Sequence, residues 1–108
     1  MRDDAPLGTF EEQVLVAILR TDPDSFGMSV RREIENVTGR EVAIGAVYAT
    51  LDRLEAKRLV RSYRGPADDG RERRMFAVSR AGAVALNESR AMRDRLWRGV
   101  NVLRLLER

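Results

Sequence analysis

The sequence predicts a mainly α-helical chain that carries one small β-hairpin and ends in one long helix. Apolar residues recur at helical spacing in four separate segments. Two short stretches that alternate between apolar and polar residues flank a turn rich in glycine and aspartate at residues 65–70. The chain has 108 residues and is 44% hydrophobic, so it is long enough for one small domain and apolar enough to fold.

The first helix is expected to begin near Phe10, because Thr9 and Glu12 have the spacing of a capping box. Apolar residues lie around most of the circumference of this helix, so it should be buried on more than one side. One side faces the domain core. We therefore expect Phe10 and Val14 to contact a second subunit on the other.

A turn at residues 21–27, with one proline and two aspartates, leads to a second helix at residues 28–37 that ends at Gly39. A third helix should start near Ile44. On a helical wheel its core face holds Ile44, Val47, Tyr48, Leu51 and Leu54. Its opposite face holds Ala46, Ala49, Thr50, Arg53 and Lys57.

Strands are expected at residues 59–63 and 75–78, on either side of the turn. Ser79 is placed to cap a final helix that reaches about Leu106. This order predicts a winged helix-turn-helix plus one long C-terminal helix. Residues 1–79 would form the winged-helix DNA-binding domain, and residues 80–108 would form the dimerisation helix.

The composition argues against catalysis and metal binding. The chain has no cysteine and no histidine, so it lacks thiolate ligands, disulfides and the commonest general base. It also lacks a glycine-rich phosphate loop, so we expect no enzyme activity, no cofactor and no metal. The longest apolar run, residues 14–19, is too short to cross a membrane, and no apolar leader follows Met1. A cytoplasmic protein is therefore expected.

The third helix and the hairpin together suggest a DNA-binding surface. Small outer residues allow a helix to lie deep in a major groove, and an arginine-rich hairpin suits the phosphate backbone. Thr50 and Arg53 are the expected base contacts. The alternatives are a plain solvent-exposed helix and a hairpin with internally paired charges. The candidate DNA-binding residues are Gly45, Ala46, Tyr48, Ala49, Thr50, Arg53, Lys57, Arg71, Arg73 and Arg74.

Residues 39–55, GREVAIGAVYATLDRLE, and 70–82, GRERRMFAVSRAG, resemble the recognition helix and the wing of PadR-type transcriptional regulators. Residues 7–11 and 26–28 are similar to the opening of that family. Ala43 stands where the family often has a hydroxyl residue. The resemblance covers nearly the whole chain and implies a short-form member that dimerises through its last helix.

The last helix carries a narrow apolar stripe that would be unfavourable in water, so we expect it to pair with a second subunit. Folding back onto its own domain is the alternative. Trp97 lies beside this stripe and is either interface packing or, as in some short family members, a stacking surface for a planar aromatic effector. The predicted dimer interface comprises Phe10, Val14, Met92, Leu96, Val100, Leu103 and Leu106.

These features predict a homodimeric transcriptional regulator, a repressor that binds a palindromic operator in double-stranded DNA. A second hypothesis is a winged-helix module that binds protein rather than DNA. A third is a DNA-binding dimer whose main role is to sense a small-molecule effector.

Overall fold

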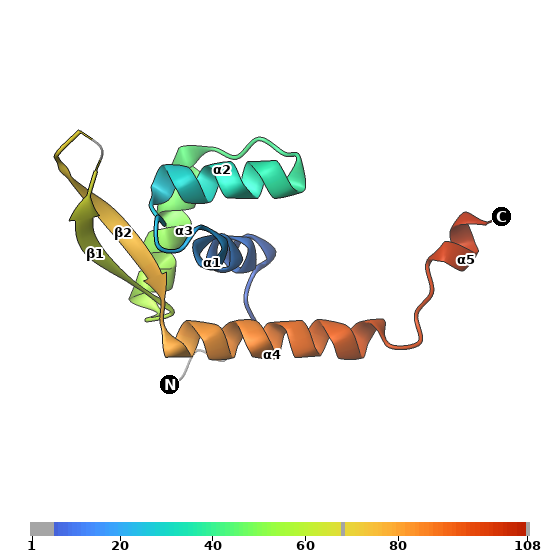
Figure 1. Ribbon diagram of the computed structural model, residues 1–108. Coiled ribbons are helices and arrows are strands. Elements are labelled where there is room, and N and C mark those ends of the chain that lie inside the picture. Colours follow the sequence, from blue (N-terminus) through green and yellow to red (C-terminus); the bar gives the residue numbers. More distant parts are fainter. Residues whose placement is uncertain (1–5, 68, 108) are drawn as a thin grey trace.

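The computed structural model describes residues 6–67 and 69–107; residues 1–5, 68 and 108 are outside the description. Three helices pack together, the hairpin lies to one side of them, and the fourth helix passes below them in the view of Figure 1. This arrangement confirms the mainly helical fold with a small β wing. The elements are α1 (Thr9–Thr21), α2 (Gly27–Thr38), α3 (Ile44–Ala56), β1 (Val60–Pro66), β2 (Glu72–Val78), α4 (Arg80–Trp97) and α5 (Leu103–Leu106).

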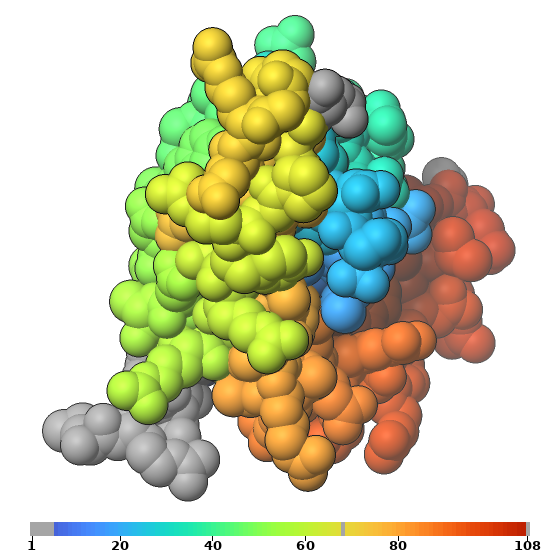
Figure 2. All heavy atoms as spheres, turned by 60° about the vertical axis from the view of Figure 1, so that its left-hand side comes forward, coloured from blue at the N-terminus to red at the C-terminus, as the bar shows by residue number. Residues whose placement is uncertain are grey.

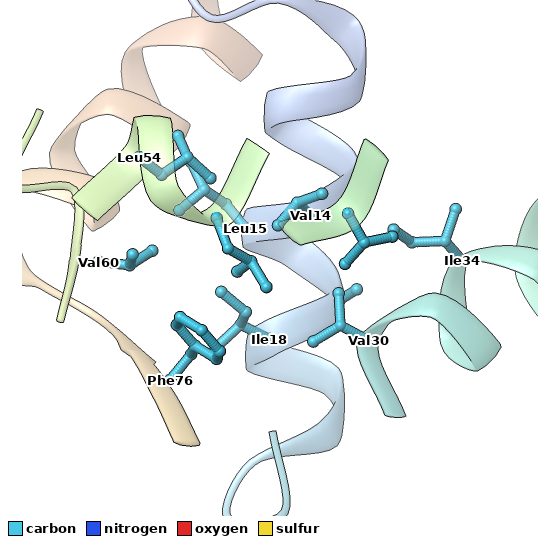
Figure 3. Close-up of a cluster of buried hydrophobic side chains, with 11 residues drawn as sticks. Val14, Leu15, Ile18, Val30, Ile34, Leu54, Val60 and Phe76 are labelled. Carbon is cyan, nitrogen blue, oxygen red and sulfur yellow. The ribbon is translucent and has the colours of Figure 1, made fainter. Parts of the chain in front are cut away.

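The core is centred on α1. Its side chains Leu15 and Ile18 point toward Phe76 of the hairpin and toward the facing sides of α2 and α3 (Figure 3). Each fully buried side chain of this size contributes about 1.5–3 kcal/mol to folding. Val14 also lies in this cluster and is 0% exposed. It has no surface to offer a second subunit, so the expectation that Val14 contacts a partner is corrected.

The N-terminus of α1 is capped one residue earlier than expected. The Gly8 amide donates a hydrogen bond to Oε1 of Glu11 at 2.9 Å, so Glu11 rather than Glu12 occupies the third helical position. The predicted pairing of Thr9 with Glu12 is therefore wrong. Glu12 lies on the outer side of the helix, where it accepts a hydrogen bond from Arg93 of α4.

Gly39 ends α2 as expected, with a left-handed φ of 71° that glycine adopts without strain. The two strands pair antiparallel, with Val60 opposite Val78. They are longer than predicted, because pairing continues to Pro66 and Glu72 through residues that lack the alternation of apolar and polar side chains. The hairpin is also joined to the α1–α2 turn, since the Phe76 amide donates to the Ser25 carbonyl oxygen at 2.9 Å.

Ser79 caps α4 as predicted, and its Oγ accepts a hydrogen bond from the Gly82 amide at 3.1 Å. The helix does not continue to Leu106, however. It ends at Trp97, and Gly99 adopts a left-handed φ of 78° before the short α5 begins. Gly99 has a low helix propensity and supplies the break. Across the described residues, no helix is both long enough and apolar enough to span a bilayer.

Candidate nucleic-acid interface

The outward face of α3 differs from the predicted one by a rotation about the helix axis. Val47, Leu51 and Leu54 are buried as expected. Thr50, however, is only 3% exposed, and its Oγ1 accepts a hydrogen bond from Arg53 at 3.2 Å. Thr50 is therefore removed from the candidate DNA contacts. The helical wheel misplaced it because Thr50 lies at the boundary between the two faces.

Tyr48 lies at the edge of the core face of α3 and is 40% exposed. Its ring lies over Gly27 at the start of α2, where a Cβ would come within 2.4 Å of the ring and of the hydroxyl oxygen. The absence of a side chain at Gly27 therefore allows α2 and α3 to approach closely. Tyr48 stays a candidate backbone contact through its hydroxyl group.

The outward face of α3 is made of small residues. Gly45, Ala46 and Ala49 are all exposed, and a Cβ added at Gly45 would meet no described atom within 4 Å. Asp52 is also exposed on this side, one turn further along. The first two turns of α3 therefore offer a flat surface, with a carboxylate only at its far end.

The cations of α3 share one carboxylate. The ammonium of Lys57 lies 3.0 Å from Oε2 of Glu11, and Nε of Arg53 lies 3.5 Å from the same oxygen. Burial disfavours the charged form of Glu11. The hydrogen bonds from Gly8 and Lys57 and the charges of Lys57 and Arg53 outweigh that effect, so the pKa of Glu11 is lowered. Glu11 thus joins the start of α1 to the basic end of α3, a link that sequence spacing did not reveal.

Glu11→Gln is expected to weaken the fold near neutral pH and to flatten its pH dependence. A carboxyl whose pKa is lowered in the folded state stabilises the fold above its unfolded pKa, and this contribution is lost as the pH falls through the folded pKa. The wild type should therefore lose stability below pH 4.5 more steeply than the variant. At about pH 7 the variant should be less stable by about 1 kcal/mol.

Urea unfolding of both proteins at about pH 7 and about pH 3 measures this difference. Glu55 also has a lowered pKa and remains in both proteins, so only the difference between them reports on Glu11. Parallel pH profiles for the two proteins would contradict the role assigned to Glu11.

Arg74 ties the wing to α3. Its guanidinium nitrogens lie 3.0 Å from Oδ1 of Asp52 and 2.6 Å from Oε1 of Glu55, and its Cζ lies 4.8 Å from the centre of the Phe76 ring. Glu55 also accepts hydrogen bonds from the amide and hydroxyl of Ser62 in β1. Burial alone would lower the pKa of Arg74, but the two carboxylates raise it above its usual value. Asp52 and Glu55 thus compensate the charge of Arg74, whose main role is to hold the wing against α3.

Other arginines of the wing are open to solvent. Arg71 is 86% exposed in its side chain and lies 3.8 Å from Asp69, while Arg61 and Arg64 of β1 are exposed without an ion pair to any described residue. Arg61 and Arg64 were not among the predicted contacts, although their place in an arginine-rich hairpin was a usable signal. The wing and α3 lie next to one another on the surface shown in Figure 2. Asp68, part of the acidic hairpin tip, is outside the described residues.

The comparison with known families identifies this arrangement. A model of the "Transcriptional regulator PadR-like family" matches residues 14–88, which include most of α1, all of α2, α3 and the wing, and the first half of α4. The chain belongs to the PadR-like family. A PadR-like chain is classed with transcriptional regulators rather than with enzymes.

The chain is also similar to individual proteins. An uncharacterised protein X from Lysinibacillus sphaericus is 30% identical over 90 residues, which are 82% of this PadR-like chain and 81% of the relative. A PadR-like transcriptional regulator from Bacillus cereus superposes with a TM-score of 0.74 at 20% identity, over 89% of this chain and 91% of the other. A Streptococcus transcriptional regulator gives a TM-score of 0.71 at 22% identity, over 88% and 91%. The two structures support the fold.

The C-terminal part of this PadR-like chain exposes much apolar surface. Phe10 and Met92 are half-buried, whereas the other candidates in the C-terminal part are largely exposed. A groove of about 160 Å³ between α1 and α2 is lined in part by Val16 and Val37, which are also exposed. The exposed candidates are Leu96, Trp97, Val100, Leu103 and Leu106.

Among the residues that the structure describes, no group of three or more histidine, cysteine or acidic side chains lies close enough to hold a metal ion.

Proposed function

We propose that this PadR-like protein is a sequence-specific regulator that binds double-stranded DNA as a homodimer, with α3 in the major groove and the wing on the adjacent backbone. The observation that carries this proposal is the flat face of α3, formed by Gly45, Ala46 and Ala49, next to the exposed arginines of the wing. A helix without long side chains on its outer face approaches base edges closely, and the arginines neutralise phosphates beside it.

Arg53 is the proposed base-reading residue. Half of its side chain is exposed, and it lies at the edge of the flat face, 3.5 Å from Glu11. A guanidinium forms two parallel hydrogen bonds with the major-groove edge of guanine. The partly exposed ion pair of Arg53 with Glu11 does not have this two-bond geometry. On DNA binding, Arg53 would leave its ion pair with Glu11 and donate hydrogen bonds to a base instead, while Lys57 would remain paired with Glu11.

A module that binds protein through α3 is the less favoured candidate. Protein interfaces usually have large apolar or aromatic anchors at their centre. The outward face of α3 has alanine and glycine there, with Tyr48 only at its edge. This composition suits a groove lined by base edges better than a protein pocket.

The DNA-binding proposal predicts an affinity that falls steeply with salt. A labelled duplex from the region upstream of the protein's own gene would be titrated at about 50 mM and about 200 mM salt, since release of counterions sets the slope. Arg71→Ala combined with Arg61→Ala should flatten the slope by about one unit for each lost phosphate contact. Arg90→Ala, on the exposed side of α4, is the matched control and should leave the slope unchanged. Binding that does not depend on salt would refute the proposal.

Homodimerisation is proposed from the apolar residues of α4 and α5. Leu103 and Leu106 are 61% and 75% exposed in the single chain, and a second subunit would remove them from water. Leu103→Asp should make the protein monomeric, because a dimer interface would have to bury an unpaired charge. Light scattering measures this change. Arg104→Asp, on the same short helix, is the control for a charge change alone. A wild type that is monomeric at micromolar concentration would exclude the dimer and the palindromic operator.

Repression is the proposed mode of regulation, since a dimer bound across a promoter blocks polymerase by occupancy alone.

An effector site at Trp97 is the second candidate function. The indole is 57% exposed at the end of α4, immediately before the break at Gly99. Two such indoles in a dimer would stack on a planar aromatic compound. Quenching of the single tryptophan's fluorescence by such compounds tests this site.

A further inference from the structure

Phe26 brings two arginines together at the junction between the wing and α2. The Cζ atom of Arg73 lies 3.9 Å from the centre of the Phe26 ring, and that of Arg32 lies 5.8 Å from the same centre. Phe26 is the N-cap residue of α2 and forms a bridge with Met75 of β2. This backbone pairing holds the Phe26 ring next to the strand that carries Arg73.

Arg73 and Arg74 are adjacent in sequence but differ in electrostatic environment. Arg74 is neutralised by Asp52 and Glu55. Arg73 has no carboxylate within ion-pairing distance among the described residues, and its neighbour is an aromatic ring. A ring orients a cation without neutralising it, so the charge of Arg73 remains available to an external anion.

The stacked geometry also leaves the hydrogen-bond donors of Arg73 available. At 3.9 Å the guanidinium is at stacking distance from the ring, which uses the face of the planar group. The N–H donors point outward in the plane of the guanidinium, where they match the oxygens of a phosphate. Lysine has no planar face and cannot combine stacking with two parallel hydrogen bonds.

We propose that Phe26 is a positioning residue that holds Arg73, with Arg32 beside it, to bind one phosphate of the DNA backbone at the junction of the wing and α2. This inference rests on the proposed DNA-binding function and deepens it. It places a phosphate contact on the α2 side of the wing, separate from the face of α3. The ring reduces the conformational freedom that Arg73 loses on binding, so it increases affinity without touching DNA.

The test uses a fluorescein-labelled duplex of mixed sequence, about 30 base pairs long, which spans two half-sites of a dimer. Phosphate contacts are independent of sequence, so fluorescence anisotropy at about 50 mM salt detects them without a known operator. Arg73→Lys keeps the charge and loses the stacking, and should weaken binding by about two- to fivefold. Arg90→Lys, at an exposed arginine of α4 outside the proposed DNA surface, is the matched control and should change affinity little.

Variants of Phe26 separate positioning from general structure. Phe26→Leu should weaken binding as much as Arg73→Lys, and Phe26→Tyr should restore wild-type affinity because its ring still stacks. The double variant Phe26→Leu with Arg73→Lys should be no weaker than either single variant. In the wild type, the Cδ protons of Arg73 should also show an upfield ring-current shift in NMR spectra that Phe26→Leu removes.

The proposal fails if Arg73→Lys binds like the wild type, or if the effects of Phe26→Leu and Arg73→Lys simply add. If Phe26→Leu unfolds, the comparison of Arg73→Lys with Arg90→Lys still tests the proposal, since both variants keep the charge and neither changes a core side chain. A wild type that binds no duplex at low salt would refute the DNA-binding function and this phosphate site together. A wild type that binds while Arg73→Lys is unaffected refutes the site alone.

Discussion

Gly82→Ala is expected to lower the free energy of unfolding by about 3 kcal/mol, which is a large share of the stability of a small domain. A Cβ at this position would lie 2.1 Å from the carbonyl oxygen of Leu59 and 2.8 Å from a methyl carbon of Val78. The first of these atoms belongs to the backbone and has no rotamer to change. The start of α4 would have to move away from the turn between α3 and β1.

Urea unfolding followed by circular dichroism measures this effect, and Gly45→Ala is the matched control. The chemical change is the same, but a Cβ at Gly45 meets no described atom within 4 Å. Alanine is also the better helix former by about 1 kcal/mol, so Gly45→Ala should stabilise the protein. Equal stabilities for the two variants would show that α4 does not pack as closely on Leu59 as the distances imply.

Ala49→Glu is expected to reduce DNA affinity by a factor of about 100 or more while leaving the fold intact. Ala49 lies on the exposed side of α3, so a glutamate there is tolerated by the isolated protein. In a groove it would place a carboxylate next to phosphates and base acceptors, and juxtaposed like charges cost several kcal/mol.

Ala83→Glu provides the control for Ala49→Glu. Ala83 is exposed on α4 and receives the same added charge away from the proposed DNA surface. Its affinity should fall only slightly, through the change in net charge. Gel shifts and circular dichroism of both variants measure binding and folding separately. A folded Ala49→Glu protein with wild-type affinity would exclude α3 as the groove-binding helix.

The order of elements was predictable from the sequence because the local signals agree. Helical periodicity, Gly39 as a stop and Ser79 as a cap each specify a boundary without long-range information. The family resemblance pointed to the same fold. The break after Trp97 could not be predicted from the apolar spacing, because the apolar stripe continues across it.

Side-chain partners were much less predictable. Glu11 and Lys57 are 46 residues apart, and no periodicity connects them. Arg73 and Arg74 are equivalent in a sequence, yet one packs on Phe26 and the other is held by Asp52 and Glu55. The tertiary fold decides which arginine keeps its charge available, so a list of arginines from the sequence overestimates the number of free cations. Thr50 shows the same limit for a residue at a helix-face boundary.

The double contact of Arg74 with Asp52 and Glu55 has a consequence for how the proposed complex would choose its operator. It fixes the wing relative to α3, so the protein presents its two DNA-contacting parts at a preset angle. A rigid protein surface leaves the duplex to bend or to change its groove width. The energy of that deformation depends on the flexibility of the base steps involved. Operator preference would therefore extend to base pairs that no side chain touches, and replacement of Arg74 would relax it at those positions.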